Sequence, residues 1–88
     1  MGGAILLDMC SKKKSLDTCD GYIGGVVDVL AKDVVFGSRA CIPQDGTTVQ
    51  QLRQIVIAEL KKYPEEQGFN AADVIAVAMS KAFPCTSG

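Results

Sequence analysis

Two groups of residues in this sequence have types and spacings that could support chemistry: a glycine-rich segment and four cysteines. The glycine-rich segment reads CDGYIGG at residues 19–25. Its glycines, Gly21, Gly24 and Gly25, could cradle a phosphate, but they match neither G-x-x-x-x-G-K-[ST] nor G-x-G-x-x-G, and they follow no predicted strand. The pattern therefore gives little support to a phosphate-binding loop.

Histidine is absent from the sequence. Without it the chain cannot assemble a Ser-His-Asp triad, a Cys-His pair or a histidine-containing metal site. The carboxylates and lysines that remain are not clustered along the sequence in a way that suggests a tuned active site. We predict no catalytic, metal-binding or cofactor-binding residues, and hence a protein that is not an enzyme.

The four cysteines are even in number and widely spaced, and they contain no C-x-x-C pair: Cys10, Cys19, Cys41 and Cys85. Zinc and redox sites normally use close pairs, so two structural disulfides in an exported protein fit better. Reduced core cysteines in a cytosolic protein are the alternative. The first residues, MGGAILLDM, lack a charged region and a long apolar run, so we expect a mature chain whose export signal has been removed.

Composition predicts one small domain spanning residues 1–88. Nearly half of the residues are hydrophobic, yet there is no tryptophan, which favours a core of closely packed aliphatic helices. The formal net charge is −1, and the only basic run, Lys12 to Lys14, is too short to follow a phosphate backbone. No segment has the roughly 18 apolar residues of a membrane span. We therefore expect neither nucleic-acid binding nor membrane insertion.

The apolar residues recur at helical spacing in most of the chain. From residue 20 to about 35 the apolar positions fall three and four residues apart, at Ile23, Val26, Val27, Leu30 and Val34. The predicted helices are about 4–10, 20–35, 47–63 and 71–83. Residues 11–18 and 36–46 are expected to be connectors. The predicted fold is an all-α, disulfide-stapled bundle of three to four helices.

Capping residues mark the ends of the last two helices. Thr47 with Gln50, or Thr48 with Gln51, forms a T-x-x-Q capping box, and Pro64 ends the helix that follows. Asn70 is a candidate N-cap for the last helix.

The order of the helices predicts how the cysteines pair. If the last three helices run up, down and up, Cys41 before the middle one lies at the same end as Cys85. Cys10 and Cys19 then fall together at the opposite end. We therefore predict the disulfides Cys10–Cys19 and Cys41–Cys85.

Within a helix, the glycines of CDGYIGG share a face with Asp28. Glycine in a helix interior costs about 1 kcal/mol relative to alanine, which suggests a packing reason for the pair at 24 and 25. A close helix–helix contact inside the monomer is the favoured interpretation. A homodimer interface and a kinked or frayed helix start remain open.

Taken as an ordered set, the motifs resemble one known family. They are Cys10, C-D-G-Y-I-G-G-V-V-D at 19–28, C-I-P at 41–43, T-x-x-Q-L-R-x-I-V at 48–56, Y-P-E at 63–65 and A-F-P-C at 82–85. This set, which covers nearly the whole chain, resembles the Rap/Tai family of immunity proteins. One departure is Tyr63, where the family commonly has histidine.

The resemblance implies a small all-helical protein of the bacterial periplasm, encoded beside a type VI secretion effector. It implies that the partner is a peptidoglycan amidase of papain-like type, whose active-site cleft the immunity protein blocks, often as a homodimer. The producing cell would thereby be protected from its neighbours' injected toxin. A periplasmic binding module or acid-stress chaperone without an amidase partner is the alternative.

Candidate contact residues follow from residue type. Phe36 and Arg39 lie in a loop beside a predicted disulfide, and aromatic and arginine side chains are enriched at interface hot spots. Tyr63, Glu65 and Glu66 form a second set, expected to be exposed at the other end of the bundle. For both sets the alternative is an ordinary solvated loop, with Phe36 and Tyr63 covering the core.

Overall fold

The fold consists of α-helices joined by 3-10 turns and one long loop. The computed structural model describes residues 1–35, 37–43 and 45–85. Its elements are α1 (Gly3–Ser11), η1 (Lys13–Ser15), α2 (Leu16–Leu30), α3 (Val49–Lys62), η2 (Pro64–Gly68) and α4 (Ala71–Ala82). In the described part of the chain only two isolated β-bridges occur outside the helices. The prediction of an all-α fold is confirmed.

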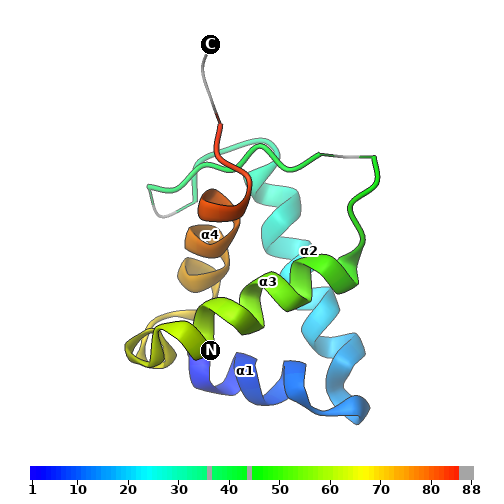
Figure 1. Ribbon diagram of the computed structural model, residues 1–88, viewed down its shortest axis with the longest axis vertical. Helices are drawn as coiled ribbons and strands as arrows, with labels where there is room; N and C mark the ends of the chain where they lie inside the picture. The colour runs from blue at the N-terminus through cyan, green and yellow to red at the C-terminus, as the bar shows by residue number, and fades with distance from the viewer. Residues whose placement is uncertain (36, 44, 86–88) are drawn as a thin grey trace.

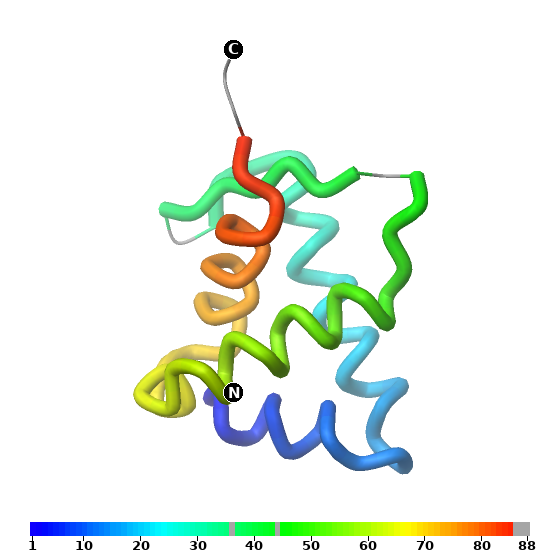
Figure 2. Tube along the Cα trace, viewed as in Figure 1, coloured from blue at the N-terminus to red at the C-terminus, as the bar shows by residue number. Residues whose placement is uncertain are grey.

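The helices α2 and α4 run in roughly the same direction, and α3 crosses obliquely against both (Figure 1). Helix α1 lies across one end of the bundle, where it packs on α2, α3 and η2. The loop between α2 and α3 crosses the opposite end, next to the last turn of α4 (Figure 2). This arrangement gives the bundle two distinct ends.

The core is aliphatic and draws on all four α-helices. Its largest fully buried side chains are Leu6, Ile23, Leu60, Ile75, Met79, Val56, Val74 and Cys19. Each such aliphatic side chain contributes about 1.5 to 3 kcal/mol by leaving water. Because α4 supplies three of these residues and contacts every other α-helix, it is the central element of the fold.

The boundaries of α2 differ from the prediction. The helix begins at Leu16, so part of the expected connector is helical, and it ends at Leu30. The N–H groups of Lys32 and Asp33 both donate to the carbonyl of Val29, which turns the chain away from the helix axis. Val34 therefore lies outside the helix in which its spacing had placed it, and it is 46% exposed.

The predicted caps are confirmed, and the choice at α3 is resolved. Thr48 Oγ1 accepts from the N–H of Gln51, whose side chain accepts from the N–H of Thr48, so the capping box is the second of the two candidates. At α4 the Asn70 side chain accepts from the N–H of Ala72. These bonds satisfy backbone donors that the helix itself leaves free.

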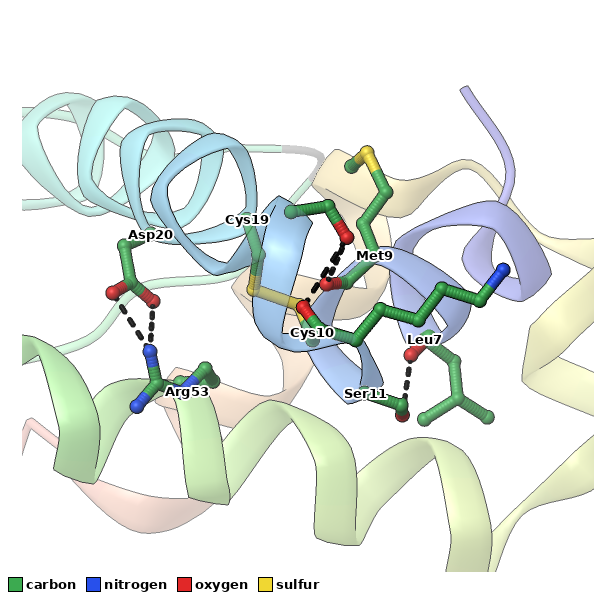
Figure 3. The surroundings of a disulfide bond; sticks show 9 residues. Leu7, Met9, Cys10, Ser11, Cys19, Asp20 and Arg53 are labelled. Atoms are coloured by element: carbon green, nitrogen blue, oxygen red, sulfur yellow. Dashed lines mark hydrogen bonds and ion pairs between the residues drawn. A yellow bond between two sulfur atoms is a disulfide. The ribbon is translucent and has the colours of Figure 1, made fainter.

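Both predicted disulfides are present, one at each end of the bundle. Cys10–Cys19 ties α1 to α2, and Cys41–Cys85 ties the long loop to the segment after α4. Figure 3 shows the first bond beside an ion pair between α2 and α3, in which Arg53 Nη1 lies 2.8 and 2.7 Å from the two carboxylate oxygens of Asp20. The α1–α2 hairpin is thus joined to α3 by charge as well as by packing.

Candidate partner-binding site

The loop after α2 carries the first candidate contact, Arg39. Val35 and Ser38 exchange two backbone hydrogen bonds, of 3.0 and 2.9 Å, across a turn in which Gly37 has a φ of 78°. A positive φ of this kind favours glycine over residues with a Cβ. Arg39 follows this turn and is exposed, whereas Phe36 lies outside the described residues.

The remainder of this loop is anchored to α4. The N–H of Cys41 donates to the carbonyl of Phe83 at 2.8 Å, two residues before the disulfide partner Cys85. A cavity of about 390 Å³ lies between the end of α2 and this loop, and Arg39 and both cysteines line it. The disulfide therefore holds Arg39 at the rim of a concave surface.

The second candidate set lies around η2, at the other end of α4. Tyr63 caps the end of α3 and is half-buried, with Lys81 Nζ 4.2 Å from its ring centroid. Glu65 is exposed and lines a groove of about 350 Å³ together with Glu66, Asp73 and the half-exposed Phe69. The groove combines three carboxyl groups with an apolar surface, and none of the described residues that line it is basic.

Glu66 corrects the expectation that this second set is exposed. Its residue surface is 8% exposed, and that of Glu59 on α3 is equally buried. Burial, followed by the hydrogen bond and the negative charge of Glu59, raises the pKa of Glu66 from 4.5 to about 7. Lys81 lowers the pKa of Glu66, because it is a cation close to this site, with its Nζ 2.8 Å from Glu59 Oε2.

Sequence reasoning did not single out Glu59, although a signal for it existed. Glu59 lies three residues after the buried Val56, at the spacing that keeps two side chains on one helix face. A carboxylate at such a position needs a partner, and α4 supplies Lys81. The hydrogen bond that Lys81 donates to Glu59 also raises the pKa of the Lys81 ammonium group.

The glycines of α2 do not make the close contact expected inside the monomer. Among the residues that the structure describes, a Cβ added at Gly21, Gly24 or Gly25 would meet no atom within 4 Å outside the neighbouring backbone, so the favoured interpretation was wrong. Asp28 is exposed and lines a separate, smaller cavity rather than the glycine groove.

The glycine face of α2 instead borders an open apolar groove of about 400 Å³. The groove is lined by Gly21, Tyr22, Gly25, Val26, Val29, Val35 and Ala72. Val29 is 53% exposed there. The close backbone approach in this fold lies at Gly3, where an added Cβ would fall 2.6 Å from the carbonyl oxygen of Glu66.

In the part of the chain that the structure describes, the cysteines are all in disulfides, and no group of three or more His, Cys, Asp or Glu residues could hold a metal ion. The helices described are too short or too polar to cross a membrane.

Comparison with known families decides which kind of binding protein this is. Residues 2–85 match the sequence profile of the Rap1a immunity proteins. The chain belongs to this family. The resemblance drawn from the cysteine, glycine and capping motifs is thereby confirmed, and membership implies an immunity role towards a cognate effector toxin. No curated protein and no solved structure matches this Rap1a immunity protein.

Proposed function

We propose that this protein acts in the bacterial periplasm, where it binds a type VI secreted peptidoglycan amidase and blocks its active-site cleft. The family match over residues 2–85 carries the proposal. Two disulfides support an oxidising compartment such as the periplasm. Protection of the producing cell then comes from occlusion of the toxin, without chemistry by the immunity protein.

Two surfaces at opposite ends of α4 are candidates for the toxin contact. The Arg39 loop is held in place by Cys41–Cys85, so little ordering cost would accompany its binding. The η2 groove offers Glu65 and Asp73 around an apolar floor and would suit a segment with a basic residue beside an apolar one. Phe36 and Tyr63 stay further candidates for the contact.

The test begins with co-expression of this protein and the product of the neighbouring open reading frame. We expect a stoichiometric complex and loss of amidase activity on purified peptidoglycan. Failure to bind or inhibit any such hydrolase would remove the proposed function while leaving the family assignment intact.

Charge-reversed variants assign the contact to a surface. Arg39→Glu tests the loop and Glu65→Lys tests the groove, and Lys13→Glu serves as an exposed control on η1. A rim charge within the contact should change affinity about ten-fold or more, mainly through the association rate. If neither variant weakens the complex more than the control, both candidate surfaces are wrong.

We also propose that the glycine face of α2 is the contact between two copies in a homodimer. The open groove beside Gly21 and Gly25 supports this, because absent Cβ atoms let a second backbone approach closely. Gly25→Leu should reduce dimerisation in sedimentation experiments, whereas Gly24→Leu, whose position does not line the groove, should leave it intact. A wild-type protein that is monomeric at high concentration would exclude the dimer.

An acid-stress chaperone is the alternative, and the exposed apolar side chains Ile5, Val29, Val34 and Phe69 are the observation that favours it. A chaperone of this kind must loosen on acidification. The raised pKa of Glu66 works against that, since protonation of this carboxyl group favours the folded state. Suppression of aggregation of a denatured client at low pH would support the chaperone, and stoichiometric binding of one folded hydrolase would exclude it.

A further inference from the structure

The two disulfides differ in their access to solvent. Cys10 and Cys19 are 3% and 0% exposed, and their bond lies between the helices α1 and α2 (Figure 3). In the other bond, Cys41 is exposed and Cys85 is half-buried. A thiolate must reach a disulfide sulfur in order to attack it. Burial therefore protects the first bond, while the second is open to attack in the folded protein.

The accessible bond borders the cavity at the end of α2. Both Cys41 and Cys85 line this space of about 390 Å³, which gives an attacking group room to approach. Among the described residues that line it, the cations Lys32 and Arg39 outnumber the single carboxylate of Asp33. Positive charge of this kind favours the thiolate, the reactive form of a thiol, over the neutral form.

The same bond joins two segments that lie outside the helices. Cys41 belongs to the loop between α2 and α3, and Cys85 follows the end of α4 at Ala82. Within the described chain, the backbone hydrogen bond from the N–H of Cys41 to the carbonyl of Phe83 also links these segments. Of the buried hydrophobic residues described, only Ala40 comes from this loop. Breaking the disulfide therefore unties the loop while the helices keep their core.

We propose that Cys41–Cys85 is an exchange site for external dithiols, such as the C-x-x-C pair of a thiol–disulfide oxidoreductase, and that its reduction releases residues 37–43 from the end of α4. A thiolate of the dithiol attacks Sγ of Cys41, the more exposed of the two residues. The disulfide breaks with its electron pair on Cys85 Sγ, which takes up a proton.

The second thiol of the dithiol completes the exchange. Its thiolate attacks the dithiol sulfur of the mixed disulfide, and Cys41 leaves as a thiolate that is protonated in turn. The dithiol is thereby oxidised to a disulfide, and its two protons balance those on the two cysteine thiols. The buried Cys10–Cys19 bond stays oxidised and keeps α1 on α2.

This exchange is a property of the free protein and does not require the effector. The released segment carries Arg39, one of the candidate toxin contacts. Only that consequence rests on the proposed function, so the experiments below use the free protein and can fail or succeed independently of toxin binding.

Timed reduction of the folded wild-type protein tests the exchange site. The protein is incubated with dithiothreitol at neutral pH, quenched with N-ethylmaleimide at intervals and mapped by mass spectrometry. We expect Cys41 and Cys85 to be labelled about ten times faster than Cys10 and Cys19, or more, because a buried bond is attacked only after the helices open. In urea that unfolds the protein, the two pairs should be labelled at similar rates.

The dependence on dithiol concentration separates direct attack from attack after unfolding. The rate of Cys41–Cys85 reduction should rise in proportion to dithiothreitol, because the bond is accessible without opening of the fold. A rate that reaches a plateau, or equal labelling of both pairs in the folded protein, would show that reduction waits for unfolding. Either result would overturn the proposal.

Amide hydrogen exchange tests release of the loop in a variant with Cys41→Ser and Cys85→Ser. The amide at position 41 should exchange within about ten-fold of its intrinsic rate, while that of Val74 in α4 should keep a protection of about a hundred-fold or more. The matched control, Cys10→Ser with Cys19→Ser, should keep position 41 as protected as in the wild type. Unchanged protection at position 41 in the first variant would refute release of the loop, and loss of protection at Val74 would show unfolding of the domain in its place.

Discussion

Alanine substitutions at two helical glycines should change stability in opposite directions. Gly3 is the first residue of α1 and is buried against η2, while Gly24 lies in the interior of α2 with open space beside it. Both substitutions add one methyl group to a helix. Helix propensity counts mainly in a helix interior, so packing decides the outcome at Gly3 and propensity decides it at Gly24.

The magnitudes follow from the contacts. A Cβ at Gly3 would lie 2.6 Å from the carbonyl oxygen of Glu66 and 3.1 Å from Cα of Gln67, both backbone atoms that cannot rotate away. Such overpacking costs about 1 to 3 kcal/mol. At Gly24 no contact with the described residues opposes the gain in helix propensity, so Gly24→Ala should stabilise the protein by about 0.5 to 1 kcal/mol.

Urea denaturation followed by circular dichroism, with both disulfides intact, measures the free energy of unfolding of each variant. In a domain of this size 1 kcal/mol corresponds to about 4 to 8 °C in melting temperature, so thermal scans should separate the two variants clearly. A Gly3→Ala protein as stable as the wild type would show that α1 does not pack on η2 as described. Destabilisation by Gly24→Ala that grows with protein concentration would place this glycine in a contact between copies.

Three further predictions concern the covalent and charged contacts. Replacing Cys41 and Cys85 by serine opens a loop with a sequence separation of 44 and should cost about 4 kcal/mol in the chain-entropy estimate, measured by urea denaturation against the wild type. Arg53→Ala should cost about 1.5 to 3 kcal/mol because it leaves the partly buried carboxylate of Asp20 unpaired; a double-mutant cycle with Asp20→Asn that gives no coupling energy would contradict this. The stability of the wild type relative to Glu66→Gln should fall as pH rises from 4.5 to about 7, because the unfolded chain releases this proton first. This loss of stability is about 3 kcal/mol at most, and about 1 to 2 kcal/mol once solvent screening at the groove is included. Denaturation midpoints of both proteins across this pH range measure the loss.

Features that depend on local sequence could be predicted. The capping box at Thr48, the N-cap at Asn70 and the end of α3 before Pro64 all rest on hydrogen bonds or steric limits within a few residues. The disulfide pairing followed from these helices, because their order fixes which cysteines share an end of the bundle.

Features that depend on which face a neighbour covers could not be predicted in the same way. The glycines of α2 have the same spacing whether a helix packs against them or solvent covers them. Here no described segment packs against them. Glu66 follows a proline and another glutamate, which suggests an exposed turn, yet in the 3-10 segment η2 it is only 8% exposed. No sequence pattern marked the close packing of Gly3, because its contacts are with residues far away in the sequence.

The connectivity of the two disulfides affects how directly the four cysteines can be oxidised to their native pairs. The cysteines pair in consecutive order, first with second and third with fourth. A chain that emerges from a translocation pore with its N-terminus first would expose Cys10 and Cys19 together, long before Cys85. An oxidase that joins thiols as they appear would therefore form both native bonds without any exchange between them. On that route, maturation would need an oxidant but no disulfide isomerase.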